Sequence, residues 1–118
     1  MENGAISDSQ ITASSENGLK WSAKNARLNY PQGGAWAPKL NPDEWLQIDF
    51  LNYRTSVTSV ATQGRSIGNI TQWVSTYRLQ YSNLEYYFKY FKEDGTNEAK
   101  VKCSADRHEL QLDDRSFF

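Results

Sequence analysis

The sequence predicts an all-β domain built from antiparallel pairs of strands, and three observations lead to this prediction. Residues 45–50 alternate between apolar and polar side chains with a period of two, as in a strand with one face on a core. Residues 57–62 are rich in β-branched side chains, which favour strands. Aromatic residues make up 14% of the 118, and no long helical pattern occurs. Strand pairs of this kind build sandwiches and barrels.

The first third of the chain predicts one short strand and several turns. Residues 10–15 form a strand candidate with small side chains, and Glu16-Asn17-Gly18 is a turn signal. Residues 23–28 can form one helical turn but are too few for a stable helix. Tyr30 begins a loop over residues 30–34, where Pro and Gly interrupt regular structure.

The remaining elements follow in order: a turn over 52–55, a loop over 65–72, a strand over 73–82, a turn over 83–85 and a strand over 86–91. The turn over 52–55 should join the strands on either side of it as an antiparallel pair. Beyond residue 101 the alternation fades, with only weak signs at Leu110 and Leu112.

The expected core combines large aromatic residues with the apolar faces of the strands. We expect these side chains to be largely buried: Trp36, Trp45, Leu46, Ile48, Val60, Trp73, Leu79 and Phe88. Arg27 lies among apolar residues, and a buried charge needs a partner. We expect it to pair with a carboxylate, first of all Asp49. Replacing Arg27 by Ala should then cost about 3 kcal/mol of stability if the pair is buried.

Composition and charge exclude several classes of protein. A length of 118 residues fits one domain, and a net charge of −1 gives no basic field for nucleic acid. No apolar run reaches the roughly 18 residues needed to span a membrane. The first residues lack the features of a signal peptide, and the single Cys103 cannot form an internal disulfide. Taken alone, these features lean towards an intracellular chain or a piece cut from a longer secreted protein.

Residues with catalytic or metal-binding chemistry are few. His108 is the only His, and it lies five residues from Cys103. A Cys/His pair needs a third orienting group and a pocket, which the sequence does not indicate. A metal site made of Asp106, His108 and Asp113 or Asp114 is the alternative to a solvated acidic tail, but zinc sites normally hold more Cys or His. We therefore expect no catalytic residue, no metal and no cofactor.

Several short segments form a recognisable set when they are read in order. They are residues 1–6, 10–15, Trp21 with 26–28, Gly34-Ala35-Trp36, 44–50, Val57, 61–65 and 73–82. Their order and spacing resemble those of the discoidin domain, also called the coagulation factor V/VIII type C domain. The resemblance covers residues 1 to about 100 of a single domain over residues 1–118, and residues 101–118 form a divergent tail.

The resemblance implies an antiparallel β-sandwich of jelly-roll type, placed outside the cell, that binds ligands through loops at one end. The family includes phosphatidylserine binders, galactose-binding lectins, collagen receptors and adhesion modules. It also has strands beyond residue 101 and a disulfide between its ends, so we expect this chain to lack the last strands and both of those cysteines. Leu84-Glu85 stand where the family usually has an Asp-Gly turn, which suits a hairpin better.

Loop residues are the candidates for ligand contact. Leu19 and Ile67 are apolar residues beside glycines in polar segments, and exposed apolar tips often mark contact with a membrane or a protein. The alternative is that both fold back onto the domain. The expected ligand-binding residues are Leu19, Lys20, Tyr30, Lys39, Arg65, Ile67 and Ile70. An Arg in the place of Arg65 touches ligand in the collagen-binding branch of the family. Asn69-Ile70-Thr71 is an N-glycosylation sequon, so we expect a glycan on Asn69.

These observations predict an extracellular binding module for cell or matrix adhesion, and no enzyme. Its partner would be a cell-surface glycan, a matrix protein or the headgroups of an anionic lipid. The alternatives are a galactose-type lectin module and a purely structural packing module. Residues 16–20, 30–39 and 65–72 should lie at the same end of the fold. Because two apolar tips supply only about 4 kcal/mol, we expect useful affinity only from an oligomer or from one module among several in a larger protein.

Overall fold

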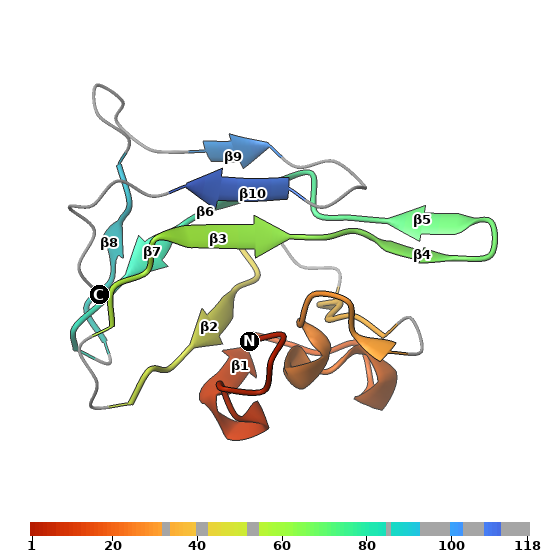
Figure 1. The fold of residues 1–118 in the computed structure, drawn as a ribbon, viewed down its shortest axis with the longest axis horizontal. Coiled ribbons are helices and arrows are strands. Elements are labelled where there is room, and N and C mark those ends of the chain that lie inside the picture. Colours follow the sequence, from red (N-terminus) through yellow and green to blue (C-terminus); the bar gives the residue numbers. More distant parts are fainter. Residues whose placement is uncertain are drawn as a thin grey trace. The chain divides into compact units, whose positions relative to one another are not determined.

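The fold consists of short strands and 3₁₀ turns (Figure 1). The computed structural model describes residues 1–31, 34–39, 43–51, 55–84 and 86–92, together with the backbone of 100–102 and 108–111. No α-helix occurs among these described residues, and their strand pairs with a defined register are all antiparallel. The prediction of an all-β, antiparallel fold is confirmed.

The chain divides into two compact units. The N-terminal unit comprises Met1–Tyr53 and Arg65–Ile70, and the C-terminal unit comprises Arg54–Gly64 and Thr71–Phe118. The following elements lie in the N-terminal unit: η1 (Asp8–Gln10), β1 (Ile11–Ala13), η2 (Leu19–Trp21), η3 (Ala23–Asn25), β2 (Leu46–Ile48) and β4 (Arg65–Ile67). The strands of the remaining chain are β3 (Ser59–Thr62), β5 (Ile70–Gln72), β6 (Thr76–Arg78), β7 (Gln80–Tyr81), β8 (Lys89–Tyr90), β9 (Lys100–Lys102) and β10 (His108–Gln111).

The β1–β2 ladder is the regular core of the N-terminal unit. Ile11 lies opposite Ile48, and Ala13 lies opposite Leu46. The expected pairing of 45–50 with 57–62 is therefore wrong. The Asp49 carboxylate accepts the backbone N–H of Leu51 at 2.6 Å, and Leu51 has a φ of 59°. This local turn ends the β1–β2 ladder at the point where β2 would have to continue into the expected hairpin with 57–62.

Two strands of the C-terminal unit, β3 and β6, pair with strands that are distant in sequence. β3 pairs with β10, and Val60 lies opposite Leu110. The expected single strand over 73–82 is divided at Leu79, because β6 pairs with β9 whereas β7 pairs with β8. β10 falls in the region where the alternation fades, and the sequence pattern did not predict it.

The segment 65–72 is a two-stranded pair, β4–β5, and the prediction of an irregular loop is wrong. The two strands are joined by Gly68 and Asn69. Gly68 has a φ of +57°, a conformation that a tight two-residue turn requires and that glycine adopts readily. Isoleucines on both sides of this turn favour the extended backbone.

The apolar core of the C-terminal unit is centred on Phe91, which is 7% exposed. Val57, Val60, Leu79 and Tyr81 pack against it, and its backbone N–H donates to the Leu79 carbonyl at 2.9 Å. Phe88, the expected core residue of this stretch, is 41% exposed. Residues 86–88 and 90–91 are all aromatic, so no alternation indicates which of them faces inward.

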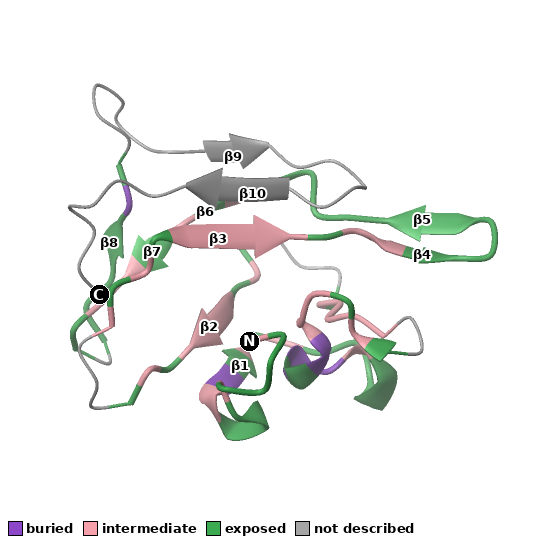
Figure 2. Cartoon of the chain, viewed as in Figure 1, coloured by how far each residue is buried: buried purple, intermediate pink, exposed green. Residues whose placement is uncertain are grey.

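Two of the tryptophans expected in the core are exposed instead. Trp45 is 49% exposed and Trp73 is 50% exposed. Trp45 lies on the face of 45–50 opposite to Leu46 and Ile48, so the alternation itself places it outside. The other expected core residues, Trp36, Leu46, Ile48, Val60 and Leu79, are half-buried (Figure 2).

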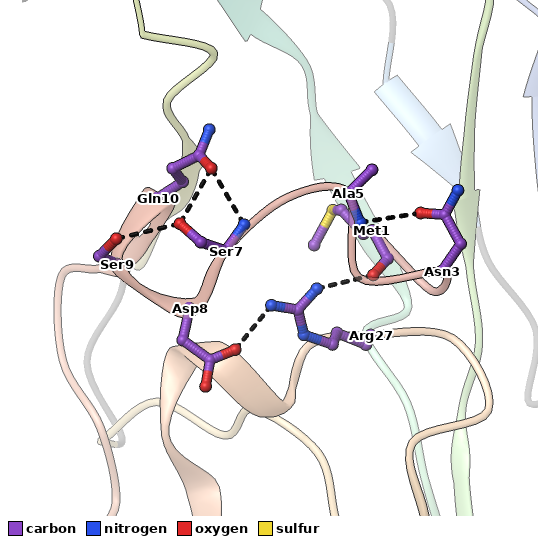
Figure 3. Close-up of polar contacts among 8 residues, drawn as sticks. All are labelled: Met1, Asn3, Ala5, Ser7, Asp8, Ser9, Gln10 and Arg27. Carbon is purple, nitrogen blue, oxygen red and sulfur yellow. Dashed lines mark hydrogen bonds and ion pairs between the residues drawn. The ribbon is translucent and has the colours of Figure 1, made fainter.

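Polar contacts hold the start of the N-terminal unit (Figure 3). Arg27 pairs with Asp8 at 2.7 Å and donates to the Met1 carbonyl at 2.6 Å. A carboxylate partner was expected, but Asp49 is not that partner, because its carboxylate is used by Leu51. The Arg27 side chain is 12% exposed whereas that of Asp8 is 63% exposed, so the pair lies at the surface.

Candidate binding site

The turn over residues 16–21 presents an apolar side chain to solvent. Gly18 has a φ of +92°, and the Trp21 N–H donates to its carbonyl at 2.9 Å, which closes the turn η2. The Glu16 carboxylate accepts the Ala23 N–H at 2.7 Å and holds the base of this turn. Leu19 is 93% exposed at its tip, and the neighbouring Lys20 is also exposed. The alternative that Leu19 folds back onto the domain is therefore wrong.

Residues 34–39 lie alongside this turn. The Asn17 N–H donates to the Ala37 carbonyl at 2.9 Å, and the Ala37 N–H donates to the Trp21 carbonyl at 3.2 Å. The indole N–H of Trp36 donates to the Ser15 carbonyl at 3.0 Å. The backbone N–H of Lys39 donates to Ser15 Oγ, also at 3.0 Å. These bonds bring the exposed Lys39 beside the segment that carries Leu19 and Lys20.

The β4–β5 hairpin carries the remaining apolar candidates. Ile67 and Ile70 flank the two-residue turn and are both exposed, as is Asn69 within it. At the other end of β4 the Arg65 guanidinium lies over the ring of Trp21, 4.4 Å from its centroid. Arg65 thereby connects the start of the hairpin to η2. Its contact there, Trp21, is two residues from Leu19 in the sequence.

The expected ligand-binding residues all belong to the N-terminal unit. Hydrogen bonds and the contact of Arg65 with Trp21 link the segments of Leu19, Lys20, Lys39 and Arg65, whereas Ile67 and Ile70 lie further along the hairpin. Tyr30 is half-buried, and its ring lies against Gly34, where a Cβ would come within 2.7 Å of it. Tyr30 therefore offers only part of its ring to a ligand.

A carboxylate stands close to the cations of this surface. Ser14 and Ser15 both donate hydroxyl hydrogen bonds to Glu44, at 2.7 Å for Ser15. These two bonds, that of Ser14 first, lower the pKa of Glu44 below its ordinary value of 4.5, and the charge of Lys39 lowers it further. Glu44 is therefore ionised at neutral pH and offsets part of the positive charge near Lys39.

The C-terminal unit contains a cleft that the sequence pattern did not predict. Its volume is about 180 Å³, and it is lined by Tyr81, Ser82, Asn83, Leu84, Tyr87 and Lys89. Ser82 Oγ accepts the Leu84 N–H at 2.9 Å and donates towards the Tyr87 carbonyl at 2.5 Å. The run of aromatic residues over 86–88 is the available sequence signal for this cleft, but the same run also fits the strand predicted over 86–91.

Among the described residues, no group of three or more His, Cys, Asp or Glu side chains is placed to hold a metal ion. Cys103, Asp106, Asp113 and Asp114 lie outside the described residues, as do Leu112 and Glu85. Only the backbone of His108 is described, in β10. In the part of the chain that the structure covers, no helix is long and apolar enough to cross a membrane.

Comparison with known proteins identifies relatives over most of the chain. The F5/8 type C domain matches residues 10–113. The chain is 40% identical over 106 residues to the venom prothrombin activator pseutarin-C non-catalytic subunit of Pseudonaja textilis, which covers 86% of this chain and 7% of that protein. It is 45% identical over 87 residues to neuropilin-1 of Mus musculus, which covers 70% of this chain and 9% of that protein.

A third relative is the discoidin, CUB and LCCL domain-containing protein 2 of Rattus norvegicus, with 36% identity over 112 residues, covering 86% of this chain and 14% of that protein. The chain thus spans only a small part of the length of the curated relatives that it matches. Domains of this family have a β-sandwich fold, which agrees with the antiparallel strands described above, and they serve as binding modules. The chain belongs to the F5/8 type C, or discoidin, domain family.

Proposed function

We propose that this chain is an extracellular adhesion module that binds the surface of an anionic membrane through residues 16–20, 34–39 and 65–70. The observation that carries the proposal is the 93% exposure of Leu19 at the tip of a closed turn, next to Lys20. A solvated leucine held away from the domain costs solubility and gains free energy only when a partner covers it. An extracellular location is supported by relatives that include a venom protein.

The arrangement of charges favours a lipid surface as the ligand. Apolar tips enter the boundary between headgroups and acyl chains, while cations beside them attract anionic headgroups. Leu19 and Ile67 supply the apolar area, and Lys20 and Lys39 supply the charge. The ionised Glu44 reduces the local positive charge, so attraction to the membrane would be modest. A lectin role at these loops is less favoured, because Tyr30 is half-buried and cannot serve as an open aromatic platform.

The affinity of one domain would be low. Leu19 contributes about 2 kcal/mol at full burial and the already partly covered Ile67 about half as much, so their sum corresponds to a dissociation constant in the millimolar range. Several copies on one membrane would bind far more tightly, because the second contact becomes intramolecular. We therefore expect binding to be detected with multimers and to be weak with the single domain.

A vesicle co-sedimentation experiment tests the proposal. The chain, displayed as a streptavidin tetramer, is mixed with phosphatidylcholine vesicles that contain or lack phosphatidylserine. The double variant Leu19→Ser/Ile67→Ser should lose binding to the anionic vesicles. The matched control Leu84→Ser/Val74→Ser removes similar exposed side chains from the C-terminal unit and should bind as the parent does.

Three outcomes would contradict the proposal. Equal binding by Leu19→Ser/Ile67→Ser and the parent would place the contact elsewhere. Absence of vesicle binding combined with a positive glycan array would favour the lectin function. If the chain binds neither vesicles nor glycans and associates with itself, the structural packing function would be favoured.

Asn69 is proposed as a glycosylation site on the same hairpin, and a glycan at this position would obstruct the insertion of Ile67 into a membrane, so the two proposals compete at this tip. Asn69 is exposed in the turn between Ile67 and Ile70, where the transferase can reach it, and Thr71 completes the sequon. Material secreted from mammalian cells should lose mass on treatment with an N-glycosidase. Thr71→Ala should abolish this loss while keeping Asn69, and Ser66→Ala should retain it. If treatment with the N-glycosidase leaves the mass unchanged, glycosylation of Asn69 is contradicted.

A further inference from the structure

The closest cation–aromatic contact among the described residues joins Arg65 to Trp21. The guanidinium carbon lies 4.4 Å from the ring centroid, compared with 5.8 Å for Arg78 over Tyr90 and 5.9 Å for Lys89 over Tyr87. Tryptophan is the strongest aromatic partner for a cation, and a planar guanidinium can stack on it. Both side chains are half-buried, which reduces the screening of the contact by water.

Two hydrogen bonds hold the backbone of Trp21 in place. Its N–H closes the turn η2 on Gly18, and its carbonyl accepts the N–H of Ala37. Its backbone is therefore fixed both to the turn that carries Leu19 and to the segment that carries Lys39. A group that stacks on the indole ring is positioned relative to both of these candidate contacts.

Apart from Arg65, the side chains of the β4–β5 strands are exposed to solvent. Arg65 is half-buried, whereas every other residue of β4 and β5 is exposed (Figure 2). A two-stranded ribbon is only marginally stable in water without packing on one face. Ile67 is two residues beyond Arg65, about 7 Å along an extended strand. The Arg65 contact is thus close enough to determine where the start of the hairpin, and with it Ile67, is held.

We propose that Arg65 is a positioning residue that clamps the β4–β5 hairpin onto Trp21 and so fixes Ile67 relative to Leu19. The assignment of a binding role to these tips rests on the function proposed above, but the clamp itself does not. Arg65 acts through the indole ring and contributes to binding by pre-organising the hairpin. A cation that served only as a direct ligand contact would need no aromatic partner.

The clamp is tested first without any ligand. In NMR spectra of the parent, the Arg65 side-chain protons should be shifted upfield by the ring current of Trp21. Amide hydrogen exchange of residues 66–70 should become about fivefold faster in Arg65→Ala and in Trp21→Leu. The double variant should exchange no faster than either single variant. Arg78→Ala removes the more distant contact with Tyr90 and should leave residues 66–70 unchanged.

Conservative variants separate the clamp from a simple charge effect. Arg65→Lys keeps the charge but loses the planar stack, so hairpin exchange should resemble that of Arg65→Ala. Trp21→Phe keeps an aromatic face and should retain part of the protection. These two variants also provide a test if the larger substitutions prevent folding. Unchanged exchange in Arg65→Lys, Arg65→Ala and Trp21→Leu would overturn the proposal.

The second test uses the phosphatidylserine vesicles of the proposed function. If that function holds, Trp21→Leu should weaken binding about as much as Arg65→Ala does, although it removes no charge. Weaker binding by Arg65→Ala alone, with unchanged hairpin exchange, would make Arg65 a direct contact and overturn the clamp. If no variant and no parent binds the vesicles, the proposed function fails while the exchange data still decide the clamp.

Discussion

The two units of the chain are stabilised by different kinds of contact. Among the described residues of the N-terminal unit, Ile11 and Ala23 are the buried apolar ones, and around them side chains bond to one another and to the backbone across the sequence. Ser14 and Ser15 bond Glu44, Arg27 bonds Asp8, and Gln10 bonds the Asp49 carbonyl. The C-terminal unit instead has an apolar cluster around Phe91. Substitution of a core residue should therefore affect the second unit most, and loss of charge should affect the first.

The largest expected effect is the loss of the Phe91 side chain. Phe91→Ala should reduce the free energy of unfolding by about 3–5 kcal/mol, because it empties the centre of the cluster. Denaturant titration followed by circular dichroism measures this change. Phe88→Ala, at an exposed position of the same stretch, should cost less than about 1 kcal/mol. Equal losses in the two variants would show that Phe91 is not the centre of the unit.

A smaller effect is expected when Arg27 is replaced in the N-terminal unit. Arg27→Ala should cost about 1–2 kcal/mol, since it removes charge-assisted bonds to Asp8 and to the Met1 carbonyl. This is below the 3 kcal/mol expected for a buried pair, because Asp8 is largely solvated. Asp8→Ala should cost only about 0.5 kcal/mol. A greater loss from Asp8→Ala than from Arg27→Ala in denaturant titrations would contradict this order.

The pH dependence of stability should differ between the units through Glu44. Its folded pKa is lowered, so its contribution is fully present above the ordinary value of 4.5 and is lost as pH falls through the lowered pKa. Carboxyl ¹³C NMR titration should give a midpoint for Glu44 below 4.5. Ser14→Ala should move it upward, and Ser9→Ala, whose hydroxyl bonds Ser7, should not. An unchanged midpoint in Ser14→Ala would show that the Ser14 bond does not form in solution.

The smallest expected effect on stability is that of the apolar tip. Leu19→Ser should change the free energy of unfolding by less than about 0.5 kcal/mol, because the side chain is already in water. Thermal denaturation compares it with Ile11→Ser, a buried position that should lose several kcal/mol. A marked loss of stability in Leu19→Ser would mean that Leu19 packs on the domain in solution.

Strand alternation and turn chemistry indicated the class of fold, and the ordered family segments indicated the family. The alternation at 45–50 located β2, but it could not indicate that β1 is the partner, because pairing depends on distant residues. Residues 86–88 and 90–91 are all aromatic and show no period, so the pattern could not distinguish Phe91 from Phe88 as the core residue. Gly68 lies in the segment 65–72, which the sequence predicted as a loop, whereas it forms the turn of a hairpin.

The site was predicted less completely than the fold. An apolar residue beside a glycine in a polar turn was sufficient to find Leu19. The contact between Arg65 and Trp21 joins residues 44 positions apart in the sequence, and no local pattern could predict it. Nor could a local pattern predict the position of Lys39, whose backbone N–H donates to Ser15 Oγ and so brings it beside the turn that carries Leu19.

The contact of Gly34 with Tyr30 has a consequence for how this chain can diverge. Any side chain at position 34 would place its Cβ within 2.8 Å of two carbons of the Tyr30 ring. A substitution at 34 therefore requires either that the Tyr30 ring move or that residue 30 already be smaller, so the order of the two changes matters. Among descendants of this sequence, substitutions at positions 30 and 34 should occur together, and replacement of the tyrosine should come first.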